Sequence, residues 1–169
     1  MKVCLACEQG FAARDWRCPR CGAEPAFVDG VPLFAPDAMR AGVGFDPRAF
    51  AVLADLEAES FWFRARNRLI VETLRRHFPA ARSLLEVGCG TGFVLQGLRA
   101  AFPDLTIAGS ELFIEALGVA QERVRDADFY QLDACRLPFS AEWDLVGVRC
   151  AGAHRTRHRG TDEHQPEPL

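Results

Sequence analysis

The chain has 169 residues, of which 49% are hydrophobic and 25% are charged, a balance typical of a globular domain. Its formal net charge of −3 gives no electrostatic reason to expect nucleic acid or an anionic membrane as the main partner. No apolar run is long enough to cross a bilayer and no secretory segment opens the chain, so we expect a cytoplasmic protein. The length leaves room for one domain, or for a small module and most of a second.

Four of the seven cysteines form two C-x2-C pairs near the N-terminus, separated by ten residues. Each pair can turn two thiolates towards one point, and two such pairs complete a tetrahedron around zinc. Disulfides are a weaker alternative because the cysteine total is odd and no export signal is present. A redox motif is weaker still because no βαβ pattern surrounds either pair. We therefore expect a zinc ribbon over residues 1–35, with a closed structural site formed by Cys4, Cys7, Cys18 and Cys21.

The segments after the cysteines connect this ribbon to the rest of the chain. An Asp-Gly turn within residues 27–34 predicts a β-hairpin that closes the ribbon. Residues 36–59 are expected to hold a linker and then a helix that begins at Asp46-Pro47, an N-cap carboxylate followed by proline.

A longer helix is predicted from about residue 61 to 78, with Ser60 as its N-cap. Its first turn holds Phe61-Trp62-Phe63, and three arginines follow. In one interpretation the arginines are solvated and the helix packs on the domain through buried side chains, those of Trp62, Leu69, Ile70 and Leu74. In the other, the aromatic turn forms a lid over a pocket. We expect packing for most of these side chains and leave both interpretations open for Phe63-Arg64.

From residue 83 the pattern alternates between strands and helices. Strands are predicted at about 84–87, 105–110, 129–132 and 143–148, with helices at about 93–102 and 113–124. Helices of this length between strands indicate right-handed crossovers and a parallel sheet. The expected fold class is therefore α/β, a Rossmann-like doubly wound sheet of which this chain supplies the first four strands.

The first of these strands runs into the sequence Glu86-Val87-Gly88-Cys89-Gly90-Thr91-Gly92, which has glycine at alternate positions. Such a turn exposes backbone N–H groups to a ligand, and the positive end of the following helix points into the same space. Glu111 and Asp133 follow the next two strands, so three acids are expected where ligands of such sheets bind. An NAD site is disfavoured because the spacing is G-x-G-x-G and because Glu86 would repel a pyrophosphate. A cationic ligand suits Glu86 better.

These residues resemble the first motif of the class I S-adenosylmethionine-dependent methyltransferases. The run from Asp133 to Phe139 and the following Trp143-Asp144-Leu145-Val146 resemble the third and fourth strand region of that family, in its type 11/12-like form. The resemblance covers about residues 61–148. It implies S-adenosylmethionine as cofactor and in-line transfer of its methyl group to an acceptor. No base is identified in the sequence, so the catalytic residues are unknown.

By this resemblance, eight residues hold the cofactor: Glu86, Gly88, Gly90, Gly92, Glu111, Leu112, Asp133 and Ala134. The glycines would cradle the methionine part and Glu86 would hold its amino group. Glu111 would bind the ribose hydroxyls, and Asp133 the adenine amine with the Ala134 N–H on the ring. Taken singly, Glu111 could be a solvated acid at a helix start and Asp133 a turn cap. Three acids at three successive strand ends favour the joint interpretation.

After Val148 the sequence becomes rich in arginine and histidine and loses its apolar periodicity. Residues 149–169 are therefore expected to be an aberrant or disordered tail. A frameshift is our preferred explanation, because residues 149–155 can be encoded so that a one-base shift reads D-V-L-E-H-I-E. The family resemblance implies F-D-V-L-E-H-I after this strand. On this hypothesis the chain is truncated and its activity is reduced.

Two classes of function follow. The first is methyl transfer to an acceptor that the sequence does not identify, with a small molecule favoured and no nucleic acid or membrane span expected. The second is a zinc-ribbon binding or scaffold protein whose Rossmann-like domain does not catalyse. Binding of S-adenosylhomocysteine would distinguish them.

Overall fold

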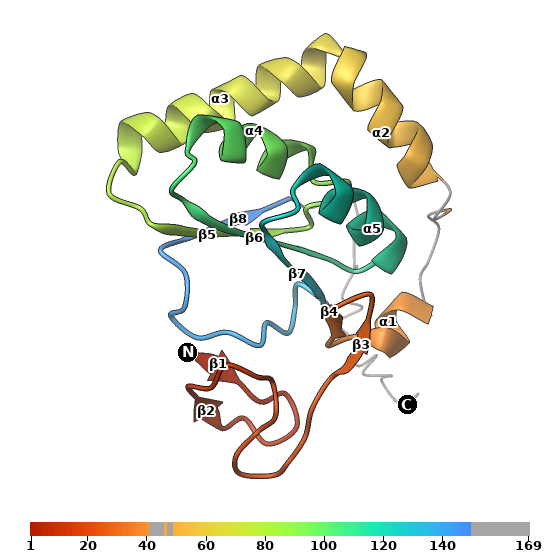
Figure 1. The fold of residues 1–169 in the computed structure, drawn as a ribbon, viewed down its shortest axis with the longest axis vertical. Helices are drawn as coiled ribbons and strands as arrows, with labels where there is room; N and C mark the ends of the chain where they lie inside the picture. Colours follow the sequence, from red (N-terminus) through yellow and green to blue (C-terminus); the bar gives the residue numbers. More distant parts are fainter. Residues whose placement is uncertain (41–45, 47–48, 150–169) are drawn as a thin grey trace, which may run out of the picture.

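The fold is given by a computed structural model that describes residues 1–40, 46 and 49–149 (Figure 1). The predicted tail from residue 150 onwards lies outside the described residues. No helix in the described part is both long enough and apolar enough to cross a membrane. In chain order the elements are β1 (Lys2–Val3), β2 (Gly10–Phe11), β3 (Ala26–Val28), β4 (Val31–Leu33), α1 (Pro36–Arg40), α2 (Ala49–Glu59), α3 (Phe61–His77), β5 (Ser83–Val87), α4 (Phe93–Ala101), β6 (Thr106–Glu111), α5 (Ile114–Arg123), β7 (Asp128–Gln131) and β8 (Leu145–Val148).

Six of these strands form one sheet in the order β3-β4-β7-β6-β5-β8, in which β7, β6, β5 and β8 all run parallel (Figure 1). The strand order changes direction at β5, which lies between β6 and β8. Val87 pairs with Ser110 and Glu111 pairs with Gln131, so the carboxyl ends of β5, β6 and β7 lie side by side. This mostly parallel sheet confirms the predicted Rossmann-like α/β class and its four parallel strands.

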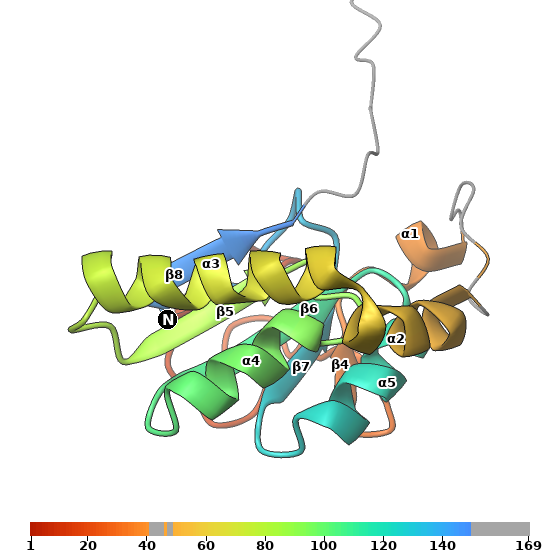
Figure 2. The same ribbon diagram turned by 90° about the horizontal axis from the view of Figure 1, so that it is seen from above.

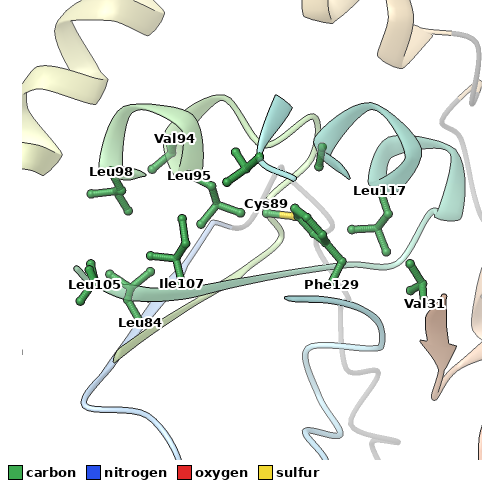
Figure 3. Close-up of a cluster of buried hydrophobic side chains, with 12 residues drawn as sticks. Val31, Leu84, Cys89, Val94, Leu95, Leu98, Leu105, Ile107, Leu117 and Phe129 are labelled. Carbon is green, nitrogen blue, oxygen red and sulfur yellow. The ribbon is translucent and has the colours of Figure 1, made fainter. Parts of the chain in front are cut away.

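One face of the sheet is covered by α3, α4 and α5 (Figures 1 and 2). Its core contains side chains from α4, α5 and the strands beneath them, among them Leu95, Leu98, Ile107, Leu117 and Phe129 (Figure 3). Helix α4 turns Phe93, Val94, Leu95 and Leu98 inward. Strand β5 is buried from residue 84 to 87, and the only charged side chain in that stretch is Glu86.

The N-terminal segment packs on the opposite face of the sheet (Figure 1). The Trp16 ring makes edge-to-face contacts with Phe34 at 4.7 Å and with Tyr130 and Phe139 at 5.7 Å between ring centroids. The Nζ of Lys2 lies 4.4 Å from the centre of the Trp16 ring. Because Trp16 lies between the two cysteine pairs in the chain, it connects the cysteine segment to the core of the large sheet.

The predicted hairpin forms around Asp29 and Gly30, whose φ angles of 48° and 80° fit a two-residue hairpin turn. The expectation that it closes the ribbon is wrong. Strand β4 instead extends the large sheet by pairing with β7, where Leu33 faces Gln131, while β1 and β2 form a separate two-stranded sheet. The physical reason is burial, because Val31 of β4 belongs to the main hydrophobic core.

Helix α3 packs through two of the four side chains that were predicted to be buried. Trp62 is 61% exposed and Leu69 is 67% exposed, so their expected burial is wrong. Ile70 and Leu74 pack against the core as predicted, and Asn67 is buried on the same side, because residues spaced by three and four lie on one side of a helix. Ser60 precedes the helix as predicted, but its side chain makes no capping hydrogen bond.

Candidate cofactor site

The turn between β5 and α4 has the geometry that its glycines predict. Gly88, Gly90 and Gly92 have φ angles of 77°, 55° and 75°, a region that side chains disfavour. Gly92 also lies against α5, where an added Cβ would come within 2.9 Å of the Cβ of Ala120. The N–H of Gly88 donates to the carbonyl of Ser110 at 2.8 Å. The turn is therefore fixed at the carboxyl end of β6.

Glu86 lies directly before this turn and its side chain is buried, with only 3% of the residue exposed. One carboxylate oxygen, Oε1, is 3.0 Å from the Nε of Arg149. The other, Oε2, is buried and has no hydrogen-bond partner in the part of the chain that the structure describes. Burial raises the pKa of Glu86 to about 7, and the positive charges of Arg149 and Arg66 oppose that shift. The site therefore holds a carboxylate with an unused oxygen, which suits a cation.

Glu111 connects the end of β6 to the glycine turn. Its Oε2 accepts the N–H of Gly90 at 3.1 Å, and its Oε1 accepts the N–H of Leu112 at 2.7 Å. The backbone carbonyl of Glu111 accepts the N–H of Leu132 at 3.1 Å, which places the end of β7 alongside. Each carboxylate oxygen has a second lone pair, so Glu111 can still accept hydroxyl donors while it holds the turn.

Asp133 follows β7 at the next strand end. Its Oδ1 accepts the N–H of Cys135 at 2.9 Å, and its carbonyl accepts the N–H of Arg136 at 2.8 Å. This geometry is that of a turn cap, one of the two interpretations considered for the residue. Ala134 is exposed beside it. The structure thus brings Glu86 and Glu111 to the glycine turn and places Asp133 beyond the neighbouring strand.

A buried polar network under the turn was not found by the sequence analysis. Glu57 of α2 is 1% exposed and accepts hydrogen bonds from the hydroxyl of Thr91 and, at 2.6 Å, from Arg123. Arg123 also donates to the Thr91 hydroxyl at 2.9 Å and to the carbonyl of Ala54 at 2.8 Å. The network attaches α2 to the turn. Local sequence gives no signal for it, because the pairing of α2 with α5 is purely tertiary.

Two arginines near Glu86 were also not predicted as site residues. The guanidinium of Arg149 lies on the glycine turn, donating to the carbonyls of Cys89 at 2.7 Å and Gly88 at 3.3 Å. Arg66 of α3 has its Nε and Nη2 buried without hydrogen-bond partners among the described residues. Burial lowers the pKa of Arg66, and Arg149 lowers it further while Glu86 raises it.

The Phe63-Arg64 end of α3, for which two interpretations were left open, contributes to a hollow on the outer surface. Arg64 lines this hollow of about 420 Å³ between α3 and α4, together with Asn67, Phe93 and Gly97. None of the glycines of the turn lines it. The lid interpretation therefore gains no support from this hollow.

The four N-terminal cysteines converge as their spacing predicts. The Sγ atoms of Cys4 and Cys21 are 3.6 Å apart and those of Cys7 and Cys18 are 3.7 Å apart, and all four lie within 4.8 Å of one another. Sulfur atoms around a tetrahedral zinc ion are separated by about 3.8 Å when each Zn–S bond is about 2.3 Å. Backbone N–H donors, first that of Cys21, lower the pKa of Cys18 to about 6. The pKa of Cys7 is raised to about 12, since the N–H of Gln9 lowers it but burial and the other three cysteines together raise it more. The cluster therefore fits zinc.

Comparison with known proteins gives one family. Residues 84–162 match the family described as a methyltransferase domain. A dTDP-3-amino-3,6-dideoxy-alpha-D-glucopyranose N,N-dimethyltransferase of Streptomyces fradiae is 43% identical over 60 residues, which cover 36% of this chain and 23% of that protein. A malonyl-acyl-carrier-protein O-methyltransferase of Bacillus anthracis is 33% identical over 81 residues, which cover 46% of this chain and 30% of that protein. The chain thus spans less than a third of either relative.

A solved structure shows the same fold. CalS10 of Micromonospora echinaspora, an amino pentose methyltransferase whose structure was solved with S-adenosylmethionine bound, aligns with a TM-score of 0.50 and 24% identity. The alignment covers 64% of this chain and 44% of CalS10. Together, the glycine turn, the mostly parallel sheet and these matches support a class I methyltransferase domain in this chain.

Proposed function

We propose that this chain binds S-adenosylmethionine at the carboxyl ends of β5, β6 and β7 and transfers its methyl group to a small-molecule acceptor. The observation that carries the proposal is the left-handed glycine turn beside Glu86, a buried carboxylate with one unpaired oxygen. A buried acid at a strand end, beside a turn whose glycines carry no Cβ, suits a ligand that brings positive charge close to the backbone.

Each predicted site residue has a role in this proposal. Gly88, Gly90 and Gly92 leave room for the methionine part, and Glu86 holds its ammonium. Glu111 accepts the ribose hydroxyls with the lone pairs that the turn leaves free, and the N–H of Leu112 holds its carboxylate in place. Asp133 and the N–H of Ala134 bind the adenine ring. We assign the methyltransferase domain to residues 60–148 and the linker and helix to 36–59, and we limit the zinc ribbon predicted at 1–35 to the part before β3, because β3 and β4 join the large sheet.

The protein's part in the reaction is to hold donor and acceptor in line. S-adenosylmethionine held by these residues would supply an electrophilic methyl group on a sulfonium. Positioning of this kind can supply much of the rate, and a protein base is needed only for an acceptor that must first lose a proton. Glu86 contributes by fixing the amino-acid end of the cofactor.

The names of the two relatives do not point to one acceptor. One methylates an amino sugar on nitrogen, and the other methylates a malonyl group on oxygen. In the first the methylated group is part of a dTDP-linked sugar, and in the second it is a malonyl group on an acyl-carrier protein. The first name supports a small-molecule acceptor here. The acceptor pocket of this chain is left open in the proposal.

A structural zinc ion at Cys4, Cys7, Cys18 and Cys21 belongs to the same proposal, supported by the convergence of the four sulfur atoms. Four thiolates leave no open position for catalysis. The second candidate function, a zinc-ribbon scaffold without catalysis, is favoured by one observation. Trp16 attaches the cysteine segment to the sheet, so the sheet could serve only as a support for the ribbon.

We also propose that the residues after Val148 are read out of frame, which would reduce the activity of this chain. The coding agreement with D-V-L-E-H-I-E supports this. Sequencing the gene tests it: an intact frame with no continuation that encodes further strands would contradict the frameshift.

Calorimetric titration with S-adenosylhomocysteine tests the central proposal. We expect one site per chain, and no binding of NAD. Glu111→Ala should weaken binding about ten- to one-hundred-fold, since charge-assisted hydrogen bonds contribute about 1.5–3 kcal/mol each. Glu115→Ala, which removes an exposed acid from α5, is the matched control and should bind normally. If neither this chain nor a frame-restored product binds S-adenosylhomocysteine at millimolar concentration, the scaffold is the better conclusion.

A further inference from the structure

Arg149 is held against the glycine turn by four polar contacts. Its Nε lies 3.0 Å from the Oε1 of Glu86 and 3.3 Å from the carbonyl oxygen of Gly88. Its Nη2 donates to the carbonyl of Cys89 at 2.7 Å, and its backbone N–H donates to the carbonyl of Val87 at 2.8 Å. The guanidinium therefore has both a charged partner and backbone acceptors at the end of β5.

This guanidinium lies where the turn lacks side chains. A Cβ built on Gly90 would be 3.4 Å from the Nη2 of Arg149, and one built on Gly88 would overlap its backbone carbonyl. The space that the glycines keep clear is thus filled by Arg149. Proteins use glycine turns without side chains to let a ligand come close to the backbone. Here the group that lies close to the backbone is the guanidinium of Arg149.

Arg149 is the cation that contacts the carboxylate of Glu86 directly. Glu86 is the buried acid, with Glu111 and Glu57 close enough to act on it electrostatically, and Arg149 and Arg66 are the nearby cations. Arg66 has buried N–H groups without partners in the described structure, so a second positive charge is already present. An ammonium placed at the Oε1 of Glu86 would meet the guanidinium of Arg149 unless that side chain moved away.

We propose that Arg149 occupies the subsite that the proposed function assigns to the ammonium of the cofactor, so that the chain competes with its own ligand. This inference rests on the proposed function. The ligand class is a cationic α-amino acid group, and its binding requires that the Arg149 side chain leave Glu86. If the side chain fills the subsite 90–99% of the time, the apparent affinity falls about ten- to one-hundred-fold, the inverse of the competent fraction.

A purely structural role for Arg149 predicts the opposite. If the guanidinium only neutralises Glu86, removing it should destabilise the chain and leave S-adenosylhomocysteine binding unchanged or weaker. If it competes, removing it should strengthen binding even where stability falls. The change in S-adenosylhomocysteine affinity therefore distinguishes the two accounts. A fall in stability does not, because both accounts allow it.

The experiment is calorimetric titration of the full chain and three variants with S-adenosylhomocysteine. We expect Arg149→Ala and Arg149→Gln to bind about ten-fold or more tightly than the wild type. The control Arg75→Ala, which removes a cation from the exposed end of α3, should bind like the wild type. Arg149→Gln keeps the length of the side chain, so it protects the test against a misfolded alanine variant.

Nitrogen-15 NMR of the Arg149 Nε–H in the wild type gives a second readout that needs no variant. Saturating S-adenosylhomocysteine should shift this signal to that of a solvent-exposed arginine. Unchanged affinity in both Arg149 variants, or an unmoved Nε–H signal at saturation, would overturn the competition while leaving the proposed function in place. Absence of binding by every folded variant would instead overturn the proposed function, and the competition with it.

Discussion

Glu57 of α2 and Arg123 at the end of α5 form a buried ion pair, 2.6 Å between Oε2 and Nη1, and Thr91 of the glycine turn hydrogen-bonds to both side chains. The two helices are thereby joined to the turn at one point. An ion pair in this position is costly to break on one side only, because the remaining charge stays buried.

Glu57→Ala should therefore lower the free energy of unfolding by about 3 kcal/mol, the lower end of the usual cost of breaking a buried pair, since Arg123 keeps backbone partners. Urea unfolding followed by circular dichroism measures the change. Glu72→Ala is the matched control, because it breaks the exposed pair with Arg75 and should cost less than about 1 kcal/mol. Equal losses in the two variants would contradict the role given to Glu57.

The pH dependence of stability should report Glu86. Burial raises its pKa from 4.5 to about 7, so between these values the native chain keeps a proton that the unfolded chain has lost. The free energy of unfolding of the wild type, measured relative to that of Glu86→Gln, should therefore fall by on the order of 3 kcal/mol as pH rises from 4.5 to 7. Above pH 7 this difference should stay constant. Unfolding free energies of both proteins at several pH values test this. A difference that is flat across the window would show that Glu86 ionises normally.

The features that the sequence predicts well are those encoded by neighbouring residues. The glycines at positions 88, 90 and 92 indicate a left-handed turn, and the paired cysteines indicate a convergent cluster, because local spacing alone determines both. The four parallel strands follow from their apolar runs in the same way. Glu57 and Arg149, by contrast, reach the turn only through tertiary contacts from distant segments, so no local pattern could reveal them. The exposure of Trp62 was missed because two helix faces carry apolar residues.

Trp16 should be important for the stability of the whole sheet. It contacts Phe34, Tyr130 and Phe139 on the face opposite α4, so Trp16→Ala removes packing from the second core. We expect a loss of roughly 2–4 kcal/mol, at or below the range for large aromatic truncations because the ring is only half-buried. Thermal unfolding measures it. The control Trp62→Ala, at a position 61% exposed, should change stability little. A larger loss of stability in Trp62→Ala than in Trp16→Ala would contradict the conclusion that Trp16 is the tryptophan packed in the core.

Zinc removal should destabilise the sheet as well as the ribbon. Purified, reduced protein is expected to contain about one zinc ion per chain by inductively coupled plasma analysis. Cys4→Ser should lose that zinc, whereas Cys135→Ser, which changes an exposed cysteine outside the cluster, should retain it.

Because Trp16 lies between the two cysteine pairs and packs against Tyr130, loosening the cluster should also loosen the second face of the sheet. Hydrogen exchange at β7 should therefore accelerate in Cys4→Ser and not in Cys135→Ser. Full zinc loss with unchanged exchange at β7 would show that ribbon and sheet are stable independently.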